Sequence, residues 1–128
     1  MKNEIQHGKM IQGLRDAVYI CDAAGYLTMF NNAAAELWGT PPMIGKDMYV
    51  GPGRVLDKQG NELTIENQPP AISIRENKPV DAVEVFIERV DGTRRHVLHS
   101  SAPIYDINGE LAGAVNLLID MTDRNWHE

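Results

Sequence analysis

Hydrophobic and polar positions alternate most clearly in the C-terminal part of the chain, from residue 80 on. Val83, Val85 and Ile87 are separated by polar or aromatic neighbours, which is the period-2 pattern of a strand with one buried face. Asp-Gly at 91–92 and Asp-Ile-Asn-Gly at 106–109 are turn signals that divide this region. The pattern therefore predicts three successive antiparallel strands, over residues 80–90, 95–102 and 111–120.

The N-terminal half carries shorter signals. Residues 17–22 and 26–30 are rich in strand-forming side chains and flank an Ala-Ala-Gly turn, which predicts a hairpin. Asn31 then caps an alanine-rich helix that Gly39 ends. Glycines punctuate residues 43–68, which indicates only short helical turns and loops. The order of elements predicts an α+β fold, in which helices cover an antiparallel sheet.

The two ends of the chain have separate predicted roles. Residues 1–14 form an irregular apolar stripe with two glycines, which predicts a short capping or dimerisation helix. Residues 15–122 make up the domain itself. Thr122 is a good N-cap, so residues 123–128 are expected to begin an outgoing connector helix.

Composition limits the classes of function. The chain has 128 residues, a formal net charge of −6 and a single cysteine, Cys21. Its size fits one domain, and its acidity argues against a general nucleic-acid binder, which neutralises phosphates with basic residues. No apolar run approaches the roughly 18 residues needed to span a bilayer. One cysteine excludes an internal disulfide framework, so we expect a cytoplasmic domain with no membrane partner.

Short motifs lie in five segments, residues 16–25, 31–39, 91–92, 103–113 and 120–122. Their order and spacing resemble those of a PAS domain, the sensory module of histidine kinases, cyclic-dinucleotide enzymes and transcription regulators. The resemblance covers residues 14–124, although 40–78 match only loosely. It implies a five-stranded antiparallel sheet in the order 2-1-5-4-3, with short helices on one face that enclose a pocket.

The last of these motifs is Asp-x-Thr, formed by Asp120 and Thr122. The resemblance implies that this motif relays a signal from the sheet to the connector helix. Asp120 is expected to tie the strand end to nearby backbone or to a cation, while Thr122 starts the connector. A capped helix that leaves a strand can turn small displacements of the sheet into rotation or a change of register.

The first and last predicted strands are apolar on both faces, so both faces of the sheet must be covered at these strands. The helices cover one face. We expect the N-terminal helix and a second subunit to share the other, because burying each aliphatic side chain contributes roughly 1.5–3 kcal/mol. The predicted homodimer and outer-face residues are Ile11, Leu14, Val18, Ile20, Leu117 and Ile119.

In PAS domains the aspartate of the Asp-x-Thr motif lies on the same face of the sheet as the pocket. The resemblance therefore implies that every second residue counted back from Asp120 faces the pocket. For the strand over 95–102, the preceding turn decides which side chains face the pocket. A three-residue loop with Gly92 in the left-handed conformation turns His99 inward, whereas a two-residue Asp-Gly turn reverses the face. We favour the three-residue loop. The predicted pocket residues are then Tyr19, Cys21, Val85, Ile87, Val97, His99, Ser101, Asn116 and Leu118.

His99, Ser101 and Asn116 would form a small polar group in this apolar pocket. Buried polar groups without partners cost on the order of 1–3 kcal/mol each. One interpretation is that the three side chains bind the polar edge of a small ligand. The other is that they satisfy one another, or a water molecule, within a filled core.

No cofactor is assigned. Haem-binding relatives place the axial histidine before the third strand, and residues 62–78 contain no histidine. Photoactive flavin relatives use a cysteine on a helix, whereas Cys21 lies in a predicted strand, so haem and a photoactive flavin are both disfavoured. No metal-ligand spacing, nucleophile elbow, phosphate loop or convergent carboxylate pair indicates a metal site or a catalytic residue.

The function expected from the sequence is therefore that of a non-enzymatic sensory module in bacterial-type, two-component signal transduction. It binds a small molecule or a partner and relays the change to an effector domain of the parent protein, such as a histidine kinase, outside this chain. The alternative is a dimerisation module with no ligand. A small enzyme that uses His99 as an acid or base is the third possibility.

Overall fold

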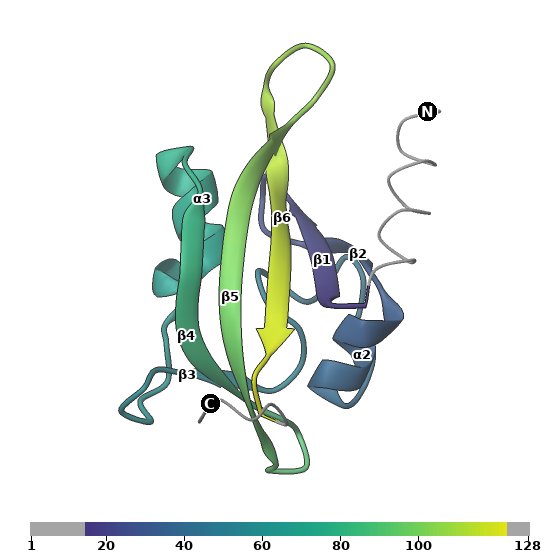
Figure 1. The fold of residues 1–128 in the computed structure, drawn as a ribbon. Helices are drawn as coiled ribbons and strands as arrows, with labels where there is room; N and C mark the ends of the chain where they lie inside the picture. Colours follow the sequence, from purple (N-terminus) through teal and green to yellow (C-terminus); the bar gives the residue numbers. More distant parts are fainter. Residues whose placement is uncertain (1–14, 123–128) are drawn as a thin grey trace.

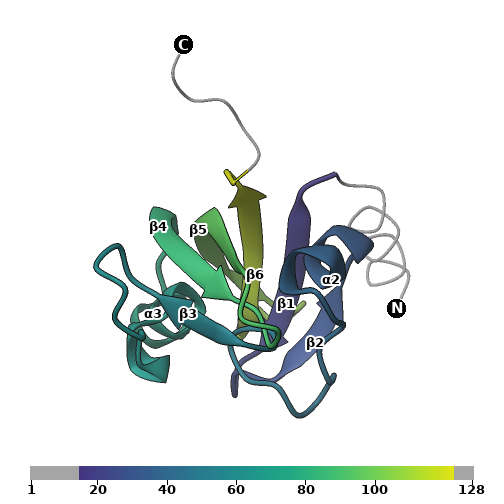
Figure 2. The ribbon, with the colours of Figure 1, turned by 90° about the horizontal axis from the view of Figure 1, so that it is seen from below.

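The structure, a computed structural model, describes residues 15–122. Its centre is an antiparallel sheet of six strands in the order β2-β1-β6-β5-β4-β3 (Figure 1). The helices α2 (Asn32–Trp38) and α3 (Pro69–Glu76) lie on one face of the sheet, together with the 3₁₀ turn η1 (Ile65–Asn67) (Figure 2). The strands are β1 (Ala17–Asp22), β2 (Leu27–Phe30), β3 (Arg54–Leu56), β4 (Val80–Glu88), β5 (Arg94–Tyr105) and β6 (Leu111–Asp120).

The α+β class and the order of the five expected strands are confirmed, but the expected number of strands is wrong. β3 is a sixth strand, and it pairs with the edge of β4 in the register Arg54↔Glu88 and Val55↔Ile87. Three residues are too few to show a strand periodicity, and glycines on both sides favour a loop. The exposed edge of β4 supplies the hydrogen-bonding partners that extend Arg54–Leu56, so the pairing comes from tertiary context.

Asn31 fixes the position of α2 against the sheet. Its Oδ1 accepts from the backbone N–H of Ala34, which caps the helix, and from that of Val18 in β1. Its Nδ2 donates to the backbone oxygen of Asp16 at 2.9 Å. The helix ends at Gly39, whose φ of 84° is favourable for glycine. The N-cap residue of α2 therefore ties the helix to β1.

The turn between β4 and β5 is a three-residue loop. The N–H of Arg89 donates to the oxygen of Thr93 at 2.7 Å, and Gly92 has a φ of +89°. This geometry turns Val97, His99 and Ser101 toward the helices, where each is at most 2% exposed. The register expected from the sequence is thus present.

The hydrophobic core lies between the sheet and the helices. Side chains of β1, β4, β5 and β6 meet Leu37 and Trp38 of α2 there. No helix in the described part of the chain is long and apolar enough to cross a membrane. The N-terminal helix expected over 1–14, with Ile11 and Leu14, and the connector expected over 123–128 both lie outside the described residues.

Candidate functional site

All the side chains predicted to line an internal pocket are on the helix-covered face of the sheet. Each of them is at most 2% exposed. They come from four strands whose registers align them, because β1 pairs with β6 and β5 lies between β6 and β4. These side chains are Tyr19, Cys21, Val85, Ile87, Val97, His99, Ser101, Asn116 and Leu118.

The polar members of this set largely bind one another. His99 Nε2 lies 3.0 Å from Asn116 Oδ1 and 3.4 Å from the Tyr19 hydroxyl. The Tyr19 hydroxyl donates to the backbone oxygen of Tyr49 at 2.6 Å. With its proton on Nε2, His99 donates to Asn116. Ser101 Oγ is an exception, because it is buried without a hydrogen-bond partner in the described part of the chain.

Burial keeps the titratable groups of the core uncharged. Desolvation lowers the pKa of His99 to about 4, although the hydrogen bond that His99 donates to Asn116 opposes the shift. It raises the pKa of the Cys21 thiol to about 11 and that of Tyr19 well above its ordinary value. At neutral pH the Cys21 sulfur is therefore a thiol, and His99 is a neutral imidazole.

The space between these side chains is nearly filled. The cavity that Tyr19, Trp38, His99 and Leu118 help to line has a volume of about 10 Å³, room for at most one water molecule. Trp38 closes it from α2, with its ring edge-on to Tyr19 at a centroid distance of 5.1 Å. This space is far smaller than a flavin or haem ring system.

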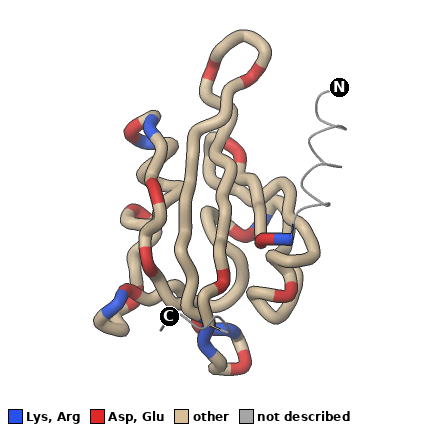
Figure 3. Tube along the Cα trace, viewed as in Figure 1, with Lys and Arg blue, Asp and Glu red and all other residues tan. Residues whose placement is uncertain are grey.

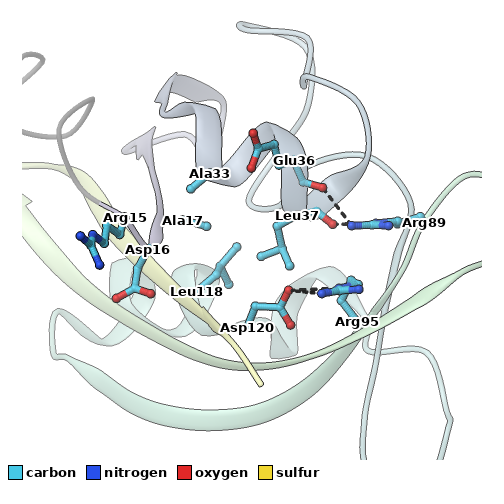
Figure 4. Close-up of a pocket in the computed structure, with 10 residues that line it drawn as sticks. All are labelled: Arg15, Asp16, Ala17, Ala33, Glu36, Leu37, Arg89, Arg95, Leu118 and Asp120. Atoms are coloured by element: carbon cyan, nitrogen blue, oxygen red, sulfur yellow. Dashed lines mark hydrogen bonds and ion pairs between the residues drawn. The ribbon is translucent and has the colours of Figure 1, made fainter. Parts of the chain in front are cut away.

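A larger cavity lies outside the core, between α2 and the ends of β1, β5 and β6 (Figure 4). Its volume is about 500 Å³, and it opens to solvent. Four small or aliphatic side chains form its apolar part: Ala17, Ala33, Leu37 and Leu118. Six charged residues surround them: Arg15, Asp16, Glu36, Arg89, Arg95 and Asp120. We call this cavity the α2 pocket.

Only Leu118 and Asp120 of the α2 pocket were singled out by sequence reasoning. Arg89 and Arg95 lie on either side of the β4–β5 turn, and nothing in their local sequence places them beside a helix far away in the chain. The nearest signal was Gly39. A Cβ at this position would lie 3.2 Å from the Arg89 side chain, so glycine allows that side chain to reach the end of α2.

Asp120 fastens the end of β6 to the start of β5. Its Oδ2 accepts from Arg95 Nε at 3.0 Å and Nη2 at 2.7 Å, and its Oδ1 accepts from the N–H of Thr122. The Thr122 hydroxyl oxygen accepts from the N–H of His96 at 2.6 Å, and Met121 N–H donates to the His96 oxygen. We call this set of contacts the Asp120 clasp. It joins the last described residues directly to the sheet.

The Asp120 carboxylate is ionised at neutral pH. Partial burial alone would raise its pKa, but the hydrogen bonds from Thr122 and Arg95 together outweigh burial and lower the pKa. The ion pair is two-thirds or more buried, with side-chain exposures of 20% for Arg95 and 33% for Asp120. A partly buried ion pair of this kind contributes more to the stability of the fold than an ion pair that is fully exposed to solvent.

The opposite face of the sheet is apolar and has no helix over it in the described part of the chain (Figures 1 and 2). Of the residues predicted to form it, Val18 is buried, while Ile20, Leu117 and Ile119 are half-buried. Most of the length of β5 and β6 carries no charged residue (Figure 3). A charged edge is formed by Glu84 of β4, which lies 2.6 Å from His96 Nε2.

No group of three or more His, Cys, Asp or Glu side chains within residues 15–122 is arranged to hold a metal ion. In the described core the Cys21 thiol donates to the backbone oxygen of Ala114, and His99 lies within hydrogen-bonding distance of Asn116 and Tyr19, so neither side chain hydrogen-bonds to a carboxylate there. Hydrogen bonds and ion pairs of the described side chains gather at the α2 pocket and the Asp120 clasp.

Several solved structures share this fold. A PAS domain from Colwellia psychrerythraea is 19% identical, with a TM-score of 0.61, over 95% of this chain and 99% of that one. The PAS domain of Bordetella pertussis BvgS is 21% identical, with a TM-score of 0.59, over 97% and 89%. A PAS domain from the fruit-fly ELK potassium channel is 13% identical, with a TM-score of 0.65, over 95% and 98%.

No curated protein matches the chain. The family model described as "PAS domain" matches residues 15–123, which is most of the sequence. Together with the sheet order and the fold of the solved structures, this match confirms the resemblance found in the motifs. The chain belongs to the PAS domain family, whose members are sensory signalling modules that typically have no enzymatic activity.

Proposed function

We propose that this PAS domain is a signal relay that works without a molecule enclosed in its core. A protein contact on the apolar face of the sheet, made by a second copy of the chain, is the input. The Asp120 clasp passes the change to whatever follows β6, and an effector of the parent protein, of the histidine-kinase type or similar, receives it. Of the three possibilities drawn from the sequence, the proposal combines the sensory relay with the dimerisation module that has no ligand in its core.

The observation that carries the proposal is the filled core. The cavity beside His99 and Tyr19 measures about 10 Å³, whereas small-molecule sites are usually of the order of 300–1,000 Å³. His99 and Asn116 satisfy each other, so this part of the polar group needs no ligand. The polar side chains of the core then act as structural groups that orient β1, β5 and β6.

The Asp120 clasp supports the choice of output. Every contact in it joins the segment Asp120–Thr122 to Arg95 or His96 of β5, or lies within that segment. A shift of β5 relative to β6 must therefore stretch or release these contacts. Two strands that move by a fraction of an ångström can in this way change the direction in which the chain leaves the sheet.

The apolar face supports the choice of input. Leu117 and Ile119 of β6 and Leu98 of β5 are half-buried and adjacent, because Leu98 pairs with Ile119. A second copy that covered them would remove apolar surface from water at about 25 cal/mol per Å². A small molecule bound at the α2 pocket is compatible with this relay.

The proposal predicts that dimerisation protects the segment after β6. Sedimentation velocity should show a concentration-dependent dimer, and hydrogen exchange at Met121 should slow as the dimer forms. Leu117→Asp places a charge in the apolar face, so it should give a monomer with fast exchange at all concentrations. The Asp120→Asn variant should still dimerise, but hydrogen exchange at its Met121 amide should no longer slow as the dimer forms.

Ile107→Asp is the matched control, because Ile107 is 98% exposed at the tip of the β5–β6 hairpin and should change neither reading. Circular dichroism would establish that each variant is folded. A Leu117→Asp protein that dimerises like the original would refute the input surface. A Met121 amide that is indifferent to dimerisation would refute the relay.

A further inference from the structure

The α2 pocket has the dimensions and the floor of a small-molecule site. Its volume of about 500 Å³ lies within the usual range of such sites, of the order of 300–1,000 Å³. Its floor is formed by four apolar residues, of which Ala33 is partly exposed while Ala17, Leu37 and Leu118 are at most 4% exposed. An aliphatic group of a few carbons can therefore rest on Ala33 and on the edges of Leu37 and Leu118.

One wall of the pocket holds an arginine in a fixed position. Arg89 Nε donates to the backbone oxygen of Leu37, and Arg89 Nη2 donates to that of Glu36, both at 2.9 Å. These carbonyls, at the C-terminal end of α2, set the plane of the guanidinium (Figure 4). A guanidinium carries five N–H donors, so those on Nη1 remain for a further acceptor. A carboxylate is the acceptor that matches this geometry.

The other charged residues that line the α2 pocket make a simple anion a poor ligand. The pocket is lined by three arginines, Arg15, Arg89 and Arg95, and by three carboxylates, Asp16, Glu36 and Asp120. The lining is thus neutral as a whole. A purely anionic ligand meets repulsion from the carboxylates and a purely cationic one meets repulsion from the arginines, whereas a zwitterion finds a partner for each of its charges.

We propose that the α2 pocket binds a small zwitterion with an apolar side chain, of the α-amino-acid class. The carboxylate of the ligand binds the Nη1 edge of Arg89. Its ammonium group faces Glu36 on the exposed rim, and its side chain lies on the floor formed by Ala33, Leu37 and Leu118.

Binding at this site reaches the relay directly. Arg95 and Asp120, the ion pair of the Asp120 clasp, form part of the pocket wall, on the same side as Arg89 (Figure 4). A charged group placed beside this pair changes the balance of its contacts, and so the strength of the clasp. The inference rests on the proposed function only for this consequence, because binding itself can be measured without dimerisation or output.

Isothermal titration of residues 1–128 with L-leucine tests the inference. Two half-analogues serve as matched probes: 4-methylpentanoate lacks the ammonium group, and 3-methylbutylamine lacks the carboxylate. L-Leucine should bind, and 3-methylbutylamine should bind at least tenfold more weakly because it loses the contact to Arg89. 4-Methylpentanoate should bind a fewfold more weakly, because the contact that it loses is to the exposed Glu36. Amide resonances of Asp120 and Thr122 should shift in the titration with L-leucine.

Three variants locate the site. Arg89→Gln should weaken binding at least tenfold, and Ala33→Leu should abolish it by filling the pocket while keeping every charge. The control Arg54→Gln removes an arginine that pairs with Glu88 and Glu62 away from the pocket, and it should bind normally. Ala33→Leu keeps the test decisive if Arg89→Gln fails to fold.

Two results would overturn the inference. One is the absence of L-leucine binding at tens of millimolar, and the other is binding that survives Ala33→Leu or that 4-methylpentanoate matches. Either result leaves the dimer-linked protection of Met121 untouched, so failure of this site is distinguishable from failure of the relay.

Discussion

Replacing Trp38 with alanine is expected to lower the free energy of unfolding by about 3–5 kcal/mol, the usual cost of removing a buried tryptophan. The indole is 2% exposed and packs edge-on against Tyr19. It also lies so close to Gly51 that a Cβ there would be 2.3 Å from the ring. Because the core has no spare volume, the neighbouring side chains cannot collapse fully into the space left behind. Urea unfolding followed by circular dichroism measures the loss.

The same variant tests whether Trp38 is what keeps the core closed. Trp38→Ala should bind indole, detectable as a rise in thermal stability with added indole, whereas the original protein should not. Ile107→Ala, at a 98% exposed position, controls for general effects and should leave stability unchanged. If Trp38→Ala does not fold, Trp38→Phe gives a smaller cavity with the same sign of effect. Indole binding by the original protein would contradict a filled core.

Acidification between pH 6.5 and 4 is expected to destabilise the protein by on the order of 3 kcal/mol through His99 alone. The pKa of His99 is about 4 in the folded protein, below the ordinary value of 6.5. Between pH 6.5 and pH 4, His99 is protonated in the unfolded chain but neutral in the folded protein. Stability from this group is therefore complete above pH 6.5 and declines as the pH falls toward 4.

Urea unfolding at several pH values measures this effect, and His99→Gln isolates it. Glutamine keeps a donor for Asn116 but does not titrate, so the slope of stability against pH should become shallower in this window. His96→Gln is the matched control, because His96 lies on the other face of the sheet beside Glu84 and is part-buried. Asp120 has a lowered pKa, so its stabilisation is lost at lower pH than this window. Parallel profiles for the original protein and His99→Gln would contradict a buried, neutral His99.

The sheet was largely predictable from the sequence because strand side chains alternate with a period of two. Once the loop at Gly92 set the parity of β5, the inward direction of His99 followed. β3 was not predictable, since Arg54–Leu56 is extended by pairing with β4 rather than by its own pattern.

The candidate site was harder to predict than the sheet. Parity showed which side chains enter the core, but not whether their volumes fill it. That depends on how Trp38 of α2 meets Tyr19 of β1, which is a three-dimensional fact. The α2 pocket was missed for a related reason, because its charged residues come from the ends of separate elements that only the folded chain brings together.

We expect this PAS domain to carry no molecule within its core. Native mass spectrometry of residues 1–128, purified without harsh treatment, tests it most directly, with Ala33→Leu measured in parallel. The expected spectrum of Ala33→Leu contains only the masses of the polypeptide and its dimer. A stoichiometric small molecule that stays bound to Ala33→Leu, and that is also retained by Leu117→Asp, lies neither in the α2 pocket nor on the apolar face, and it would contradict a core without a bound molecule.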